Sequence, residues 1–391
     1  MKPLATGQRV LTWLSVCPPD ESTSKCQKQV YIICSVLVLV ANVIGFVTSV
    51  AYVHRFVSID LEKSLCSMLQ ICAMGCVSYA YILMFVLRHK VTAFLGHLSQ
   101  IYKQYANEDT FRYLAEANNK SEWLWKFYFK YLLGGFLSCN VFSTIALAIV
   151  CWLTFGKLDT DYLHIPYLVI WPWNQHTVMG YCVEICADII CGFCYFFYNG
   201  IVLLMFISIC WHHRAFCQII GHLVRKLDQR DTSQNDKVLL SKLIRSHIQF
   251  KVLFEQSSQI YSSYILVQLI CSMGALACSV FQLDMAIKHI DLGLYMAIVN
   301  ISAGAYNLFL YCYFGKMVTD NFAKISEYLY DIKWYELPVE LQKYIILAIQ
   351  NAQLPLHYHG FKVAILNLET FCAMIRAVFS YYMMFKTLTT G

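Results

Sequence analysis

Residues 363–385 read VAILNLETFCAMIRAVFSYYMMF, an apolar run that nevertheless carries a carboxylate, Glu369, and a guanidinium, Arg376. A helix of this length is about 35 Å long, which exceeds the roughly 30 Å hydrocarbon core of a bilayer. An arginine near its middle costs at least about 2.5–3.5 kcal/mol in lipid, so the side chain is expected to face protein or water. Glu369 and Arg376 lie seven residues apart and therefore share one helix face. The run predicts a membrane helix with a functional polar face, and a polar contact inside a helix bundle is the alternative.

The composition of the whole chain places it among membrane proteins. Hydrophobic residues make up 58% of the sequence and charged residues only 14%, against about 25% charged in ordinary soluble domains. We predict an all-α membrane protein with seven transmembrane helices. The seven apolar runs of membrane length are 30–53, 64–87, 131–156, 189–211, 260–283, 292–315 and 363–385.

The distribution of Lys and Arg predicts how the chain is oriented. The N-terminal tail and the loops 88–130, 212–259 and 316–362 hold 24 of these residues, and the segments on the other side hold 5. Because cytoplasmic loops carry the excess of positive charge, the N-terminus is predicted to be cytoplasmic and the C-terminus extracellular. This topology is the inverse of that of a G-protein-coupled receptor. It also accounts for the net charge of +6 without a nucleic-acid partner.

The three long cytoplasmic loops carry helical periodicity, so we expect them to extend the membrane helices into a folded layer. Their apolar faces need a partner surface within the chain or on another subunit. The apolar positions that show the period are Val91, Phe94, Leu95, Leu98, Ile101 and Tyr102 in one loop, and Ile219, Ile220, Leu223, Val224 and Leu227 in another. The predicted parts are a cytoplasmic segment 1–29, six helices over 30–315, an anchor segment 316–362, and the last helix with a short extracellular tail over 363–391.

Histidines and cysteines give no signature of an enzyme, a metal site or a cofactor. The pairs His212, His213 and His357, His359 lie at cytoplasmic edges without a metal-binding pattern, so we expect solvated side chains. Cys182 and Cys186 lie on the extracellular side, where their helical spacing favours free thiols over a disulfide. We predict no catalytic residue.

Aromatic, Met and Cys side chains are dense in the predicted membrane helices. For any single residue, helix packing is the commoner explanation. As a group, those in the extracellular halves of the helices form a candidate apolar pocket for a small, neutral, hydrophobic ligand bound to a few hydroxyls. Its candidate lining residues are Met68, Tyr79, Ala148, Trp152, Tyr195, Tyr198, Phe281 and Tyr295.

Five short motifs in the C-terminal third resemble the insect odorant receptor family. They are YCYFG (311–315), WYELP (334–338), AQLPL (352–356), NLETF (367–371) and SYYM (380–383). The resemblance implies an odorant-gated, non-selective cation channel in the plasma membrane of olfactory sensory neurons. It also implies that a tuning subunit assembles with a larger shared co-receptor, as a tetramer. Arg376 and the short 212–259 loop resemble the tuning subunits rather than the co-receptor.

The same resemblance assigns roles to the end of the chain. The seventh helix would line the pore, with Met384 and Leu388 at hydrophobic gate positions and Thr387 at a polar position beside them. Lys386 departs from the family pattern. Because a cation in the pore wall opposes cation flow, we expect this side chain to point away from the pore axis. A gustatory receptor subunit is the nearest alternative, and the missing C-terminal Gln-Phe signature disfavours it. A transporter or a G-protein-coupled receptor is a more distant one.

Overall fold

The computed structural model describes residues 3–14, 16–17, 24–57, 61–132, 134, 178–228, 236–289 and 292–390. This part of the chain is almost entirely helical, as predicted. Its α-helices are α1 (Ala5–Trp13), α2 (Lys25–Phe56), α3 (Leu61–Val86), α4 (Arg88–Tyr105), α5 (Phe111–Phe127), α7 (Val178–Asp228), α8 (Asp236–His289), α9 (Leu292–Asp331), α10 (Val339–Gln353) and α11 (Leu368–Thr390). Shorter elements are the π-helical turn η1 (Tyr128–Leu132), the 3-10 turn η2 (Trp334–Glu336), and the strands β1 (His359–Gly360) and β2 (Ala364–Ile365).

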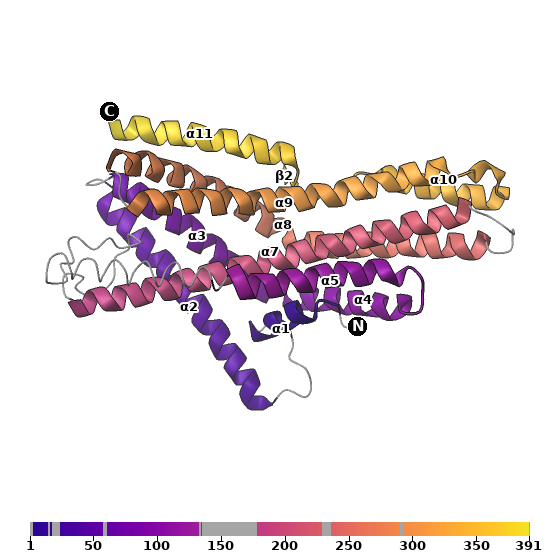
Figure 1. The fold of residues 1–391 in the computed structure, drawn as a ribbon, viewed down its shortest axis with the longest axis horizontal. Helices are drawn as coiled ribbons and strands as arrows, with labels where there is room; N and C mark the ends of the chain where they lie inside the picture. Colours follow the sequence, from indigo (N-terminus) through magenta and orange to yellow (C-terminus); the bar gives the residue numbers. More distant parts are fainter. Residues whose placement is uncertain are drawn as a thin grey trace.

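Three helices, α7, α8 and α9, run along the long axis of the molecule (Figure 1). They contain 51, 54 and 40 residues. At 1.5 Å per residue, the longest two measure about 75–80 Å, more than twice the thickness of a hydrocarbon core. Each of these helices therefore extends well beyond a membrane span.

Five of the described helices, α2, α3, α7, α8 and α9, contain stretches long and apolar enough to cross a membrane. They contain all or nearly all of five of the predicted spans. Helix α11 has 23 residues, three of them charged, and is not among those five. The predicted span 131–156 falls almost wholly outside the described residues. Cys186, in α7, is an exposed free thiol.

The predicted extension layer is formed by α4, α5, α10 and the distal parts of α7, α8 and α9, at the right of Figure 1. All eleven apolar positions that showed the helical period in 88–130 and 212–259 are buried. Helix α1 docks on this layer: the Leu4 amide donates to Asn118 Oδ1 at 2.8 Å, and Gly7 lies against the Trp125 ring. The partner surface that these apolar faces need therefore lies within the chain.

One histidine pair differs from the prediction. His212 and His213 are buried, not solvated, because α4 and α8 cover this part of α7. His212 Nε2 lies 3.0 Å from the Tyr102 hydroxyl, and His213 Nε2 lies 3.0 Å from Ser257 Oγ. The pair supplies hydrogen bonds between α7 and its neighbours inside the extension layer.

The antiparallel pair of β1 and β2 holds the start of α11 against α8. His359 lies opposite Ile365 and Gly360 opposite Ala364 in its register. Gly360 is pressed onto α8: a Cβ atom at this position would lie 2.8 Å from the backbone nitrogen of Leu266. A side chain has no room there, so the glycine permits the close approach of the two backbones.

We expect Gly360→Ala to lower the free energy of unfolding by about 1–3 kcal/mol, because the strand pair must move off α8 to make room. The thermal midpoint of the detergent-solubilised protein measures this. Gly96→Ala is the matched control: Gly96 lies on the exposed side of α4 with no atom near its added Cβ. Alanine there is expected to be neutral or to stabilise the helix by about 0.5–1 kcal/mol. Equal midpoints for the two variants would contradict the close-approach argument.

Candidate functional site

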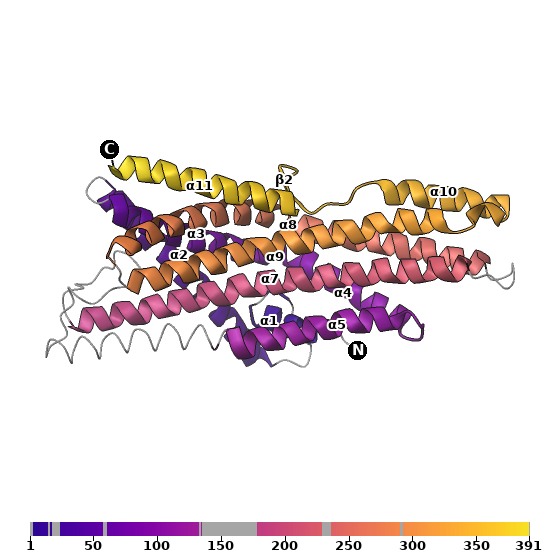
Figure 2. The same ribbon diagram turned by 45° about the horizontal axis from the view of Figure 1, so that its top comes forward.

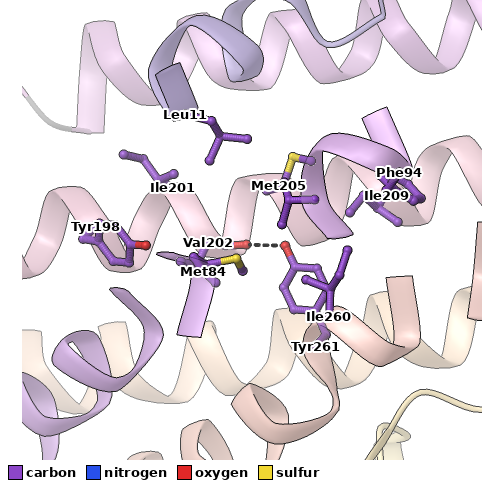
Figure 3. Close-up of a pocket in the computed structure, with 11 residues that line it drawn as sticks. Leu11, Met84, Phe94, Tyr198, Ile201, Val202, Met205, Ile209, Ile260 and Tyr261 are labelled. Carbon is purple, nitrogen blue, oxygen red and sulfur yellow. Dashed lines mark hydrogen bonds between the residues drawn. The ribbon is translucent and has the colours of Figure 1, made fainter. Parts of the chain in front are cut away.

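A small, partly enclosed apolar cavity lies where α1, α3, α4, α7 and α8 meet (Figure 3). Its volume is about 10 Å³, which is room for about one water-sized occupant. The lining residues are Leu11, Met84, Val91, Phe94, Tyr198, Ile201, Val202, Met205, Ile209, Ile260 and Tyr261.

Helix α7 supplies one wall of the cavity from a single face. Tyr198, Val202, Met205 and Ile209 follow one another at intervals of four, three and four residues, which places them on one side of a helix. Leu11 closes the cavity from α1, on the opposite side of the space in Figure 3. The cavity exists because the N-terminal helix and α4 fold back onto this face of α7.

The chemistry of the cavity suits an uncharged apolar guest. Its described lining contains no ionisable side chain other than the phenols Tyr198 and Tyr261. The Tyr261 hydroxyl already donates to the Val202 carbonyl at 3.3 Å. Two of the lining residues, Met84 and Met205, have flexible side chains that adapt to irregular shapes. A guest larger than a water molecule would enter by moving these methionines.

The structure brings one of the eight predicted ligand residues, Tyr198, to this cavity. Phe281 is buried elsewhere, with its ring 6.5 Å from that of Phe385 in α11. Met68 is exposed and Tyr79 is half-buried, both on α3. The remaining four fall outside what the structure describes: Ala148 and Trp152 as whole residues, Tyr195 and Tyr295 for their side chains.

Sequence reasoning missed the contributions of α1 and α4 to the cavity. Leu11 and Phe94 belong to segments that were predicted to lie in the cytoplasm, outside the pocket. The helical periodicity of 88–130 marked Phe94 as a buried position, but periodicity does not identify the partner. Contacts between segments this far apart in the sequence carry no local signal.

A buried amide, Gln268 of α8, joins three helices close to the cavity. Its Oε1 accepts from the Tyr264 hydroxyl at 2.7 Å and from Cys76 Sγ of α3 at 2.9 Å. Its Nε2 donates to Ser272 Oγ at 2.8 Å and to Asn307 Oδ1 of α9 at 3.1 Å. We call these five residues the Gln268 hub. Both acceptor positions and both N–H groups of the amide are used, which is the full hydrogen-bonding capacity of a glutamine side chain.

An aromatic bridge connects the Gln268 hub with the cavity wall. The Tyr264 hydroxyl lies 3.1 Å from that of Tyr311 in α9. The ring of Phe206 in α7 lies 5.2 Å from Tyr311 and also 5.2 Å from Tyr261, which lines the cavity. Aromatic pairs at such distances pack with defined geometry. A continuous chain of packed rings therefore joins the cavity wall to α9.

Helix α11 lies at the edge of the bundle in both views, beside α8 and α9 (Figures 1 and 2). One of its faces is packed: Val378 is buried, and the ring of Phe371 lies 5.7 Å from that of Phe309 in α9. The other face is exposed and bears side chains repeating at helical spacing. It carries Glu369, Arg376, Met384, Thr387 and Leu388.

Lys386 is turned from this exposed face toward α8. Its ammonium lies 3.3 Å from Asp284 Oδ1 and 3.0 Å from the Tyr382 hydroxyl. Its two neighbours are thus a carboxylate and a phenol oxygen, both of which can accept a hydrogen bond from the ammonium. The group is thus held as a cation beside α8.

We expect Gln268→Leu to lower the free energy of unfolding by about 1–3 kcal/mol, because leucine makes none of the four hydrogen bonds that the Gln268 amide makes to the other hub residues. The thermal midpoint in detergent measures the loss. Gln259→Leu is the matched control, since Gln259 lies on an exposed position of the same helix. Should both variants unfold at the wild-type temperature, the hub contributes nothing to the packing of α3, α8 and α9.

Solved structures of one insect receptor share the fold. The structure of the olfactory receptor OR5 from Machilis hrabei in complex with eugenol superposes with a TM-score of 0.76, at 14% sequence identity, and covers 98% of this chain and 98% of that one. A second structure of the same receptor gives a TM-score of 0.72 at 14% identity, over 96% of this chain and 97% of that one. At this level of identity the likeness establishes the fold.

Sequence comparison establishes the family. The putative odorant receptor 83c of Drosophila melanogaster is 24% identical over 41% of this chain, and odorant receptor 2a of the same fly is 28% identical over 37%. The matched stretches span 39% and 36% of those relatives' own lengths. The family model described as 7tm Odorant receptor matches residues 63–379. The chain belongs to the 7tm odorant receptor family.

Proposed function

We propose that this chain is the odorant-binding tuning subunit of a heteromeric, ligand-gated, non-selective cation channel, formed with the odorant receptor co-receptor. The observation that carries the proposal is the two-faced character of α11 in a chain of this family. One face of the helix is packed on α8 and α9, and the other presents Glu369 and Arg376 at its surface.

The charged residues on the exposed face of α11 need water or another subunit beside them. Neither Glu369 nor Arg376 is in an ion pair with any residue in the described part of the chain. Charged side chains in such a helix are costly in lipid and normally face a bundle interior or a water-filled path. A pore between subunits supplies both. In this arrangement Met384 and Leu388 form a hydrophobic gate, and Thr387 is the polar position beside it.

The proposed ligand is a small, neutral volatile molecule. The apolar lining and the phenol groups of the cavity suit the chemistry of such a ligand and offer no counter-charge to an ion, although the cavity must widen to admit it. The similar receptor OR5 was solved in complex with eugenol. Tyr198 is the candidate contact that lies at the described cavity, and we retain the other seven predicted residues as candidates for a pocket in the extracellular halves of the helices.

The proposed setting is the plasma membrane of olfactory sensory neurons, with a cytoplasmic N-terminus. The charge asymmetry of the loops supports this orientation. Membrane lipids are the expected neighbours of α2, on which apolar residues such as Ile33, Leu37 and Val47 are exposed. No enzymatic activity and no cofactor are part of the proposal.

Whole-cell current tests the proposal directly. We expect an odorant-evoked cation current in cells that express this chain together with the co-receptor, and none when this chain is expressed alone. The co-receptor alone is the control for ligands that act without this chain. Surface labelling of the chain shows that it reached the plasma membrane. If surface-expressed chain and co-receptor give no current to a broad panel of neutral volatiles, while a G-protein readout responds, the channel proposal is wrong.

We expect Tyr198→Phe to raise the half-effective concentration of odorants that carry a hydrogen-bonding group by about fivefold to tenfold, which corresponds to one hydrogen bond of about 1 kcal/mol. Purely hydrocarbon odorants should be unaffected. Dose-response curves of the co-expressed channel provide the measurement. Tyr306→Phe, at an exposed tyrosine of α9, is the matched control. Identical curves for polar and hydrocarbon odorants would remove Tyr198 from the ligand site.

A further inference from the structure

A lysine in the last turns of a pore helix needs an explanation in a cation channel. Lys386 lies two residues from both Met384 and Leu388, the proposed gate residues. A free ammonium at the mouth of a pore repels cations and lowers their local concentration. Unless its charge is kept off the conduction path, Lys386 opposes the activity proposed for this chain.

Helix geometry separates Lys386 from the exposed face. Successive residues of an α-helix are rotated by about 100°, so Lys386 lies about 160° around the helix from Met384 and from Leu388. The two gate residues are only about 40° apart. Their side chains are 46% and 61% exposed, respectively. The base of the lysine side chain therefore starts on the opposite side of α11.

Asp284 and Tyr382 both hold the ammonium. Asp284, near the end of α8, lies 3.3 Å away, and Tyr382, one turn earlier in α11, lies 3.0 Å away. The ion pair is partly open to solvent, with the Lys386 and Asp284 side chains 41% and 25% exposed. Ion pairs at such exposure add little to stability. The importance of this ion pair is instead that it determines the position of the Lys386 charge.

We propose that Asp284 is a determinant of cation permeation. Together with Tyr382 it holds the Lys386 ammonium on the α8 side of α11, away from the exposed face that carries Met384 and Leu388. The inference rests on the proposed function, since it requires that α11 line the pore. It adds to the proposed function a role for Asp284, a residue of α8 that faces Lys386 rather than the pore.

Loss of the tether frees a long, flexible cation. Lysine carries its charge on a four-carbon stem with several rotatable bonds, so an untethered ammonium samples positions nearer the pore mouth. A unit charge about 10 Å from a permeating ion, in water, changes its local concentration about twofold. Salt screens this effect, because the Debye length is about 8 Å at physiological ionic strength and shorter at high salt.

The first test is unitary conductance of the channel co-expressed with the co-receptor. Asp284→Asn is expected to lower inward cation conductance about twofold in low salt, and less in high salt. Lys386→Gln is expected to conduct like the wild type. The double variant, Asp284→Asn with Lys386→Gln, is expected to recover wild-type conductance, a rescue that a merely structural role of Asp284 does not predict.

Asp320→Asn is the matched control, because Asp320 makes an exposed ion pair with Lys316 of the same helix, α9, at 3.0 Å. It should leave conductance unchanged. Wild-type conductance in Asp284→Asn, or the same deficit in the double variant, would overturn the inference. Odorant dose-response and surface expression of each variant verify that the compared channels are folded and assembled.

A second test is independent of any current. In the purified full-length chain, an amine-acylating reagent followed by mass spectrometry measures the reactivity of the Lys386 amine. Asp284→Asn is expected to increase the acylation rate of Lys386 several-fold, because the ion pair shields the amine, while Lys316 serves as the internal reference. An unchanged rate would overturn the tether. Absence of current in every wild-type combination would instead overturn the proposed function, and the permeation role with it.

Discussion

The cost of placing a charge in hydrocarbon is the constraint on which the arrangement of the C-terminal helix depends. Helix α11 is long enough to span a bilayer yet carries Glu369, Arg376 and Lys386. The fold handles these charges in two ways. Lys386 is turned back onto α8, where a carboxylate and a phenol receive it. Glu369 and Arg376 are left on the exposed face, so the isolated subunit presents a surface that lipid does not satisfy. Under the proposed function, water and neighbouring subunits complete the environment of this face.

The remainder of the structure supports that helix through burial and through polar contacts between helices. Helices α7, α8 and α9 continue beyond membrane length, and their apolar faces close on one another and on α4, α5 and α10. Several buried histidines and tyrosines in this layer hydrogen-bond to other helices; His212, for example, pairs with Tyr102. Near the cavity, the hydrogen bonds of the Gln268 hub join α3, α8 and α9 in the same way. Since a buried polar group without a partner is costly, each such contact restricts the register of the helices as well as their stability.

The sequence allowed the helical class, most spans and the buried face of the extension layer to be predicted, because each depends on a local pattern. Helical spacing alone predicts that residues such as Phe94 and Ile219 are buried. What could not be predicted depends on long-range contacts. His212 and His213 were assigned to solvent, because nothing near them in the sequence shows that α4 and α8 cover them. The ion pair of Lys386 joins residues 102 positions apart. Of the candidate ligand residues, Tyr198 alone among the described side chains lies at the cavity, whose other walls come from α1 and α4.

The cavity wall and α11 are linked by packed contacts, and under the proposed function these contacts are a route by which ligand binding acts at a distance. Tyr261 at the cavity wall contacts Phe206, which contacts Tyr311 of α9. Helix α9 in turn packs on α11 through Phe309 and Phe371. Because the cavity holds only a water-sized volume, a larger guest must displace its walls, and closely packed side chains pass such displacements on rather than absorb them. Under the proposed function, the small size of the cavity makes occupancy by a ligand a change in helix packing, and the packing of α9 helps to position α11.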